Sequence, residues 1–216
     1  MVLDTNGMVR TPEATVRRRR GLPRAEQVAR NRADLLAAAG QVFRELGYSG
    51  ASLDAIADAA GFSKGAVYSH FTSKADLFLS LLESRIEDRA RAQREAADAL
   101  DGGTPLTFIE RIFAASRADP QWRLAVLEFR VVAARDTELR DRYARLHQRT
   151  LAGVVDALGR FLDSLGTAPD LPVETLAIAG LIFDAGVFLE ELASASLSAE
   201  ESAVLFGRLL GLQLGA

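Results

Sequence analysis

The stretch SLDAIADAAGFSKGAVYSHF, residues 52–71, decides how the chain folds at its N-terminal end. Two short runs of helix-forming residues flank Gly61, which can adopt the positive φ that a tight turn requires. Ala57 is a small residue where a second helix could cross, and Val67 can fill the angle between the two helices. This spacing predicts a helix-turn-helix unit, although any helical hairpin can show it.

The second helix of this unit carries side chains that its small core does not need. Ser63 is expected to cap the helix, whose free N–H groups attract anions. Lys64 and Tyr68 have polar tips on the outward face, and Gly65 allows a phosphate or a base to approach the backbone. His70 fits either a DNA contact or a purely structural role. The outward face therefore predicts contact with a nucleic-acid duplex.

Charge is distributed unevenly along the 216 residues, whose formal net charge is −3. Residues 1–75 contain 11 basic and 7 acidic residues, whereas residues 76–216 contain 15 and 22. A basic segment followed by a larger acidic part can mark an end of the chain that faces nucleic acid.

Composition excludes several other kinds of site. There is no cysteine, so disulfides and thiolate metal sites are excluded, and the two histidines lie far apart in the sequence. We therefore expect no metal and no cofactor. The N-terminus lacks the apolar core of a secretory signal, and the most apolar run is too short to span a bilayer. These features predict a cytoplasmic protein without membrane contact.

Apolar residues recur at helical spacing along most of the chain, and strand-like alternation is hard to find. The spacing predicts an all-α fold of about nine helices. Their expected ranges are 29–46, 52–60, 64–71, 73–100, 106–117, 121–135, 137–165, 173–195 and 199–211.

Residues 32–78 closely resemble the N-terminal domain of TetR-family transcriptional regulators. The matching features are "AA…F…GY" in the first helix, Ser52 at the start of the second, "IA..AG.SKG..Y.HF" and "SK..L". Phe62 departs conservatively from the valine that is more frequent in the family. The resemblance implies that Ser52 hydrogen-bonds a phosphate and that Lys74 clamps one. It implies a DNA-binding set of Ser52, Ser63, Lys64, Gly65, Tyr68, His70 and Lys74.

Ahead of this domain lies a basic segment with four consecutive arginines: Arg17, Arg18, Arg19 and Arg20. They fit either a solvated tail or an arm that reaches the minor groove or the DNA backbone. Three regions are therefore expected. They are a disordered basic arm at 1–27, a helix-turn-helix DNA-binding domain at 28–78, and a helical effector-binding and dimerisation domain at 79–216.

The helix expected at 173–195 is apolar on nearly every side, so it must be covered all round. Burial within one chain could cover it, but pairing with a second copy explains the excess better. The resemblance implies a four-helix dimer interface formed by the last two helices. The candidate interface residues are Ile178, Leu181, Ile182, Val187, Leu205 and Leu209. A homodimer would present two recognition helices one turn of DNA apart, so the operator should be roughly palindromic.

The resemblance also implies a pocket for a small apolar or amphipathic effector in the larger domain. The candidate effector-binding residues are Phe108, Ile112, Phe113, Trp122, Phe129, Arg130, Tyr143 and His147. Aromatic residues at helical spacing are more often part of a core, and that alternative remains open here. The helix at 77–100 connects the two parts and is the candidate lever between pocket and DNA.

The expected function is that of a ligand-responsive transcriptional repressor that binds double-stranded DNA as a homodimer. The alternative is a transcriptional activator, or a less specific architectural DNA-binding protein, of the same fold. An enzyme is disfavoured, since the sequence shows no nucleophile–base pair, no phosphate loop and no metal-ligand spacing.

Overall fold

The computed structural model describes residues 23–98, 105–164, 166, 169–194 and 197–209. Within these residues the fold is all-α, with nine helices and no strand, as predicted. The helices are α1 (Arg24–Gly50), α2 (Leu53–Ala60), α3 (Lys64–His70), α4 (Lys74–Asp98), α5 (Pro105–Arg117), α6 (Pro120–Ala133), α7 (Thr137–Ser164), α8 (Val173–Leu192) and α9 (Ala199–Leu209). No helix of the described ranges is long and apolar enough to cross a membrane.

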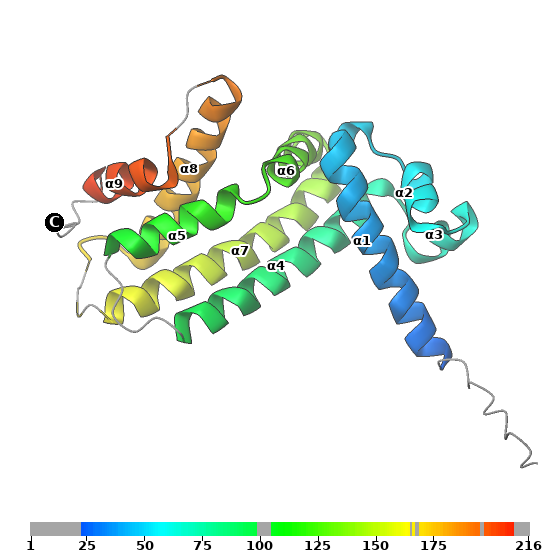
Figure 1. Cartoon of the computed structure of the whole chain (residues 1–216), viewed down its shortest axis with the longest axis horizontal. Helices are drawn as coiled ribbons and strands as arrows, with labels where there is room; N and C mark the ends of the chain where they lie inside the picture. The colour runs from blue at the N-terminus through cyan, green and yellow to red at the C-terminus, as the bar shows by residue number, and fades with distance from the viewer. Residues whose placement is uncertain (1–22, 99–104, 165, 167–168, 195–196, 210–216) are drawn as a thin grey trace, which may run out of the picture.

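Helix α1 begins earlier than the sequence predicted. Pro23 stands at its N-cap, and helix-forming polar residues follow from Arg24 onward. The prediction of a disordered arm over 1–27 is therefore wrong for residues 24–27, while Arg17, Arg18, Arg19 and Arg20 lie outside the described residues. The added residues 24–28 are exposed (Figure 1). The predicted range of 29–46 was based on apolar spacing, which does not extend into this exposed segment.

The helical path of α1 breaks at Gly47, as predicted. This residue has φ 69° and ψ 176°, a combination that glycine adopts without steric cost. Glu128 of α6 packs against the break: a Cβ added at Gly47 would lie 2.5 Å from Glu128 Oε1. The Ser49 N–H donates to Glu128 Oε2 at 2.7 Å, so α6 is tied to the end of α1.

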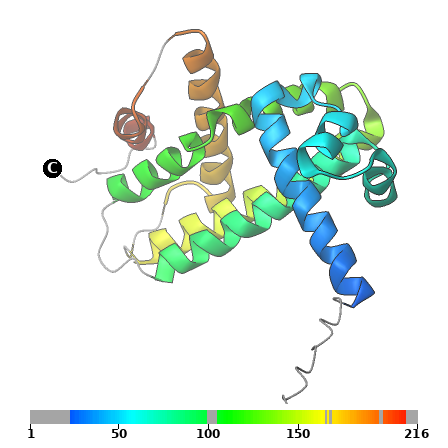
Figure 2. The ribbon, with the colours of Figure 1, turned by 45° about the vertical axis from the view of Figure 1, so that its right-hand side comes forward.

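Helices α1, α2 and α3 form one end of the molecule, and the first part of α4 completes their core (Figure 2). The same core continues into α6. The ring of Phe78 on α4 lies 4.9 Å from Phe43 on α1 and 4.6 Å from Phe129 on α6, measured between ring centroids. The end formed by α1, α2 and α3 and the larger part therefore share one hydrophobic core.

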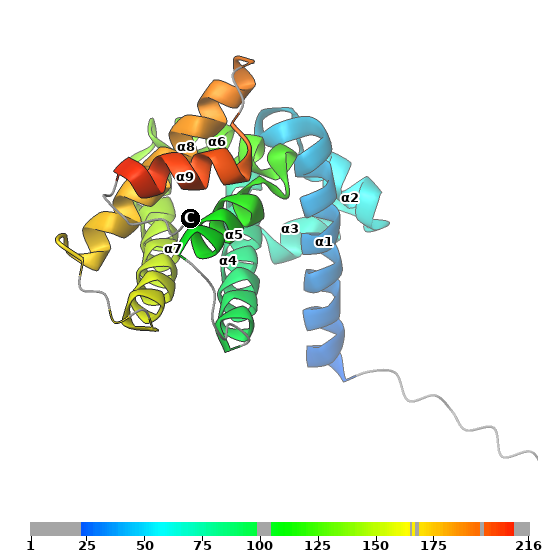
Figure 3. The same cartoon turned by 60° about the vertical axis from the view of Figure 1, so that its left-hand side comes forward.

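The long helices α4 and α7 lie side by side and run in the same direction (Figure 1). Arg142 Nη2 of α7 is 2.7 Å from Asp76 Oδ1 near the start of α4, and Arg149 reaches Glu83 and Glu87 further along. Helices α8 and α9 lie at the end of the molecule away from α2 and α3, with α9 packed on α5 (Figure 3).

Candidate nucleic-acid interface and effector cavities

The turn of the helix-turn-helix has the geometry that the sequence predicted. Gly61 is left-handed, with φ 69° and ψ 28°, and the Phe62 N–H donates to Ala57 O at 2.9 Å. Ala57 and Val67 are fully buried where the two helices cross. Ser52 Oγ accepts from the Ala55 N–H at 3.1 Å and so caps α2.

The outward face of α3 combines a free backbone with exposed polar side chains. Ser63 Oγ accepts from the Ala66 N–H at 3.2 Å, and nothing lies within 4 Å of a Cβ built on Gly65. Tyr68 is exposed although its ring is large and mainly apolar. His70 is half-buried, with its ring centroid 6.3 Å from that of Phe71. Five of the predicted DNA-contacting residues, with Lys64 among them, therefore lie on one short helix and its cap.

Lys64 is already paired within the chain. Its Nζ donates to Asp54 Oδ2 of α2 at 2.5 Å, and this hydrogen bond raises the pKa of the Lys64 ammonium. Both side chains are largely exposed, so the pair contributes little to stability. Lys64 can therefore exchange Asp54 for a phosphate at small cost.

Lys74 is also engaged within the chain, through backbone carbonyl groups. Its Nζ donates to the carbonyl oxygens of Tyr48 at 2.7 Å, Ala51 at 2.9 Å and Ser49 at 3.3 Å. It also lies 4.6 Å from the centroid of the Tyr48 ring, and burial lowers the pKa of the ammonium. All three ammonium hydrogens are thus used to hold the end of α1 on α4. Lys74 therefore helps to position the candidate interface, and its assignment to a DNA phosphate stays a prediction.

Lys74→Met is expected to lower the free energy of unfolding by about 2 kcal/mol, because three carbonyl oxygens lose a charged donor. Lys64→Met is the matched control, since the chain's other lysine has only an exposed ion pair, and its effect should stay below about 1 kcal/mol. Urea denaturation measures both. Equal effects would show that the carbonyl contacts of Lys74 do not stabilise the fold.

Two adjoining cavities lie in the larger part of the molecule. The smaller, of about 150 Å³, is enclosed mainly by apolar side chains of α4, α5, α7, α8 and α9 and includes Ile112 and Phe113. The larger, of about 440 Å³, includes Trp122, Tyr143 and His147. Burial raises the pKa of Tyr143 and lowers that of His147, so both groups favour their neutral forms. Five of the predicted effector-binding residues therefore line a cavity.

Two of the remaining predicted effector residues, Phe129 and Arg130, do not line either cavity. Phe129 is fully buried in the core with Phe78, because its position on α6 faces α1 and α4. Arg130 is exposed and lies 5.8 Å from the centroid of the Tyr143 ring, on the outside of α6. The side chain of Phe108 lies outside the described residues. The assignment of Phe129 to effector binding is corrected to a core role.

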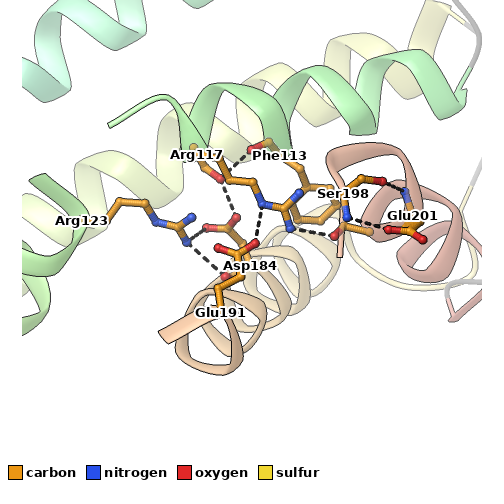
Figure 4. A network of polar contacts seen from close by, with 9 residues as sticks. Phe113, Arg117, Arg123, Asp184, Glu191, Ser198 and Glu201 are labelled. Atoms are coloured by element: carbon orange, nitrogen blue, oxygen red, sulfur yellow. Dashed lines mark hydrogen bonds and ion pairs between the residues drawn. The ribbon is translucent and has the colours of Figure 1, made fainter. Parts of the chain in front are cut away.

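A polar network that the sequence analysis missed joins α5, α6, α8 and α9 (Figure 4). Asp184 of α8 accepts from Ser116 Oγ at 2.6 Å and from Arg123 Nη2 at 2.8 Å. Arg117 Nη2 donates to Ser202 Oγ at 2.7 Å, and Arg117 Nε lies 3.1 Å from Glu191 Oε1. The sequence signal that could have indicated this network is Asp184, an acidic residue within the apolar run of α8.

The predicted interface residues of α8 and α9 differ in exposure. Ile182 and Leu209 are 67% and 68% exposed, and Ile178 and Leu205 are also exposed. Leu181 is half-buried and lines the smaller cavity, and Val187 is half-buried. An apolar surface therefore remains uncovered on these two helices within one chain. Among the described residues, no group of His, Asp or Glu is arranged to hold a metal ion.

Comparison with known proteins agrees with this geometry. Residues 35–81 match the family model of bacterial regulatory proteins of the tetR family. The chain is 41% identical to the HTH-type transcriptional activator FasR of Mycolicibacterium smegmatis over 85 residues. These residues make up 39% of this chain and 37% of FasR. Over 151 residues it is 29% identical to the HTH-type transcriptional repressor AcnR of Corynebacterium diphtheriae, covering 69% of this chain and 75% of AcnR.

A solved structure shares the fold over most of both chains. The transcriptional regulator FadR of Bacillus subtilis, in complex with stearoyl-CoA, superposes with a TM-score of 0.63 at 19% sequence identity. The superposition covers 85% of this chain and 97% of that one. Residues 35–81 are therefore a helix-turn-helix domain of the TetR family type, and the relatives that the chain matches are transcriptional regulators. Because the relatives are regulators, the prediction that the chain is not an enzyme is confirmed.

Proposed function

We propose that the chain is a repressor that binds a roughly palindromic operator as a homodimer and is released by a small apolar or amphipathic effector. The observation that carries the DNA-binding part is the face of α3, where an open Gly65 lies beside the exposed side chains of Lys64 and Tyr68. Phosphate contacts would set the register on DNA, and base-edge contacts would specify the sequence. Such a regulator acts in the cytoplasm.

We propose that residues 28–78 bind DNA and that residues 79–216 bind the effector and form the dimer. A basic arm containing Arg17–Arg20 would add contacts to the minor groove or the backbone. Repression is favoured over activation because the match to the repressor AcnR covers more of this chain than the match to FasR. FasR itself supports an activator as the second candidate.

Two contacts support a route from the cavities to the DNA. Helices α4 and α6 both contribute walls to the larger cavity. Each also holds the end of α1: α4 through Lys74, and α6 through the bond from Ser49 N–H to Glu128. A ligand that favours one arrangement of α4 and α6 would shift DNA affinity by its difference in affinity for the two states.

Selection of bound fragments from a random DNA pool tests the proposal directly. A palindromic consensus with half-sites about one helical turn apart is the expected result. Recovery of fragments without any shared sequence would remove the specific regulator and leave the architectural alternative. Transcription from a promoter that carries the consensus then separates repression from activation.

Lys64→Ala and Tyr68→Ala are each expected to weaken operator binding about tenfold while leaving the dimer folded, because each removes one contact to the duplex. Arg140→Ala is the control: Arg140 is also exposed and also paired with an acid, Asp141, but it lies on α7. Fluorescence anisotropy with labelled operator measures the affinities. Wild-type affinity in both α3 variants would refute the assigned surface.

A further inference from the structure

Arg89 of α4 occupies a position that no predicted role explains. It contributes to the walls of both cavities, so it marks the place where they adjoin. The side chain is exposed by surface area, and part of that surface faces the cavity space that it lines. The surrounding protein nevertheless desolvates the guanidinium and lowers the pKa of Arg89.

The other charged side chains that line the cavities have partners. Asp184 is paired with Arg123, Asp119 with Arg85, Asp88 with Arg91, and Arg149 with Glu83 and Glu87. Arg89 is attracted by Asp184 and repelled by Arg123, but within the described part of the chain it forms neither a hydrogen bond nor an ion pair. Counted over the described side chains, the cavities therefore have one positive charge without a partner.

The space next to Arg89 is apolar. The smaller cavity is walled by side chains such as Ile109, Ile112, Val154 and Phe206, and at about 150 Å³ it has the volume at which an apolar cavity takes up a benzene-sized group. The larger cavity has room for the rest of a ligand, within the usual range of roughly 300–1,000 Å³ for small-molecule sites.

We infer that the effector is an amphipathic monocarboxylate, whose carboxylate pairs with Arg89 and whose apolar body occupies the smaller cavity. Arg89 has no partner beside these apolar walls, and a carboxylate would supply one through charge-assisted hydrogen bonds. A cationic ligand is disfavoured, since the acids of the walls already have partners. The inference rests on the proposed function and names the chemical class of its effector.

The position of Arg89 also connects the ligand with DNA binding. Arg89 lies on the same helix as Lys74, which holds the end of α1 through three carbonyl oxygens. A carboxylate bound at Arg89 therefore acts directly on α4.

Calorimetric titration of the full chain with decanoate, 1-decanol and decylammonium tests the inference. Wild type is expected to bind decanoate roughly ten- to a hundredfold more tightly than the alcohol, as a charged hydrogen bond supplies, and more tightly than the amine. Arg89→Met should abolish this preference, and Arg89→Lys, which keeps the charge, should retain most of it. Arg160→Met is the matched control, because it removes an exposed guanidinium of α7 that lines neither cavity.

Equal affinity for decanoate and 1-decanol in wild type would overturn the inference, as would the absence of decanoate binding or a preference that survives Arg89→Met. Operator binding is a separate readout. A chain that selects DNA but shows no carboxylate preference overturns this inference alone. Arg89-dependent binding of decanoate that leaves operator affinity unchanged keeps the carboxylate site at Arg89 but overturns its role as the effector site.

Discussion

Phe129→Ala is expected to lower the free energy of unfolding by about 4 kcal/mol, the cost of truncating a large side chain in a packed core. Phe129 is fully buried, with ring centroids 4.6 Å from Phe78 and 5.0 Å from Tyr48. Its partners belong to the DNA-binding end, whereas Phe129 itself lies on α6. The cavity left behind would therefore loosen the junction between the two parts, and operator affinity should fall as well.

Leu127→Ala is the control for this change, because Leu127 is half-buried on the same helix and lines the larger cavity. We expect it to cost at most about 1.5 kcal/mol, since a partly exposed site loses less apolar burial. Urea denaturation measures the stability of both variants. A loss below about 1 kcal/mol for Phe129→Ala would show that α6 does not share a core with α1 and α4.

Ile182→Glu is expected to convert the proposed dimer into monomers and to weaken operator binding at least a hundredfold. Ile182 is 67% exposed in one chain, in the middle of the apolar surface of α8 and α9. In a two-fold interface the substitution occurs twice, and each buried unpaired carboxylate costs about 3–5 kcal/mol. A monomer would reach only one half-site at a time.

Val131→Glu is the matched control, since Val131 is a 51% exposed aliphatic residue on α6, outside α8 and α9. Analytical ultracentrifugation gives the mass of each variant, and anisotropy gives its affinity for DNA. An intact dimer in Ile182→Glu would place the interface elsewhere. Ile182 is a better choice than Leu181, because charge at Leu181 would enter the smaller cavity.

Local signals in the sequence predicted those helix ends that a serine cap or a left-handed glycine marks. Serines at 52 and 63 cap α2 and α3, and Gly61 takes the left-handed conformation at the end of α2. Ser73 and Ser198 likewise accept from N–H groups three residues on. Each of these features depends on residues within one turn of chain, so composition and spacing are informative.

Contacts between distant segments could not be predicted in this way. The partners of Lys74 lie 23 to 26 residues away, and Glu128 reaches Ser49 across 79 residues. Phe129 has the same apolar character whether it faces a core or a cavity. Only the packing of α6 on α1 determines which of the two it faces. Arg89 gave no signal, since one more arginine in a chain rich in arginine is unremarkable until its neighbours are known.

The Lys64–Asp54 pair has a consequence for how binding depends on salt. A basic side chain that is free in solution releases part of the counterion atmosphere of the duplex when it neutralises a phosphate. Lys64 already has a carboxylate beside it, which would remain near the duplex as an uncompensated negative charge after the exchange. The net positive charge that α2 and α3 bring to the DNA is therefore smaller than the number of basic side chains on that face. High ionic strength should weaken binding less than the number of these basic side chains implies.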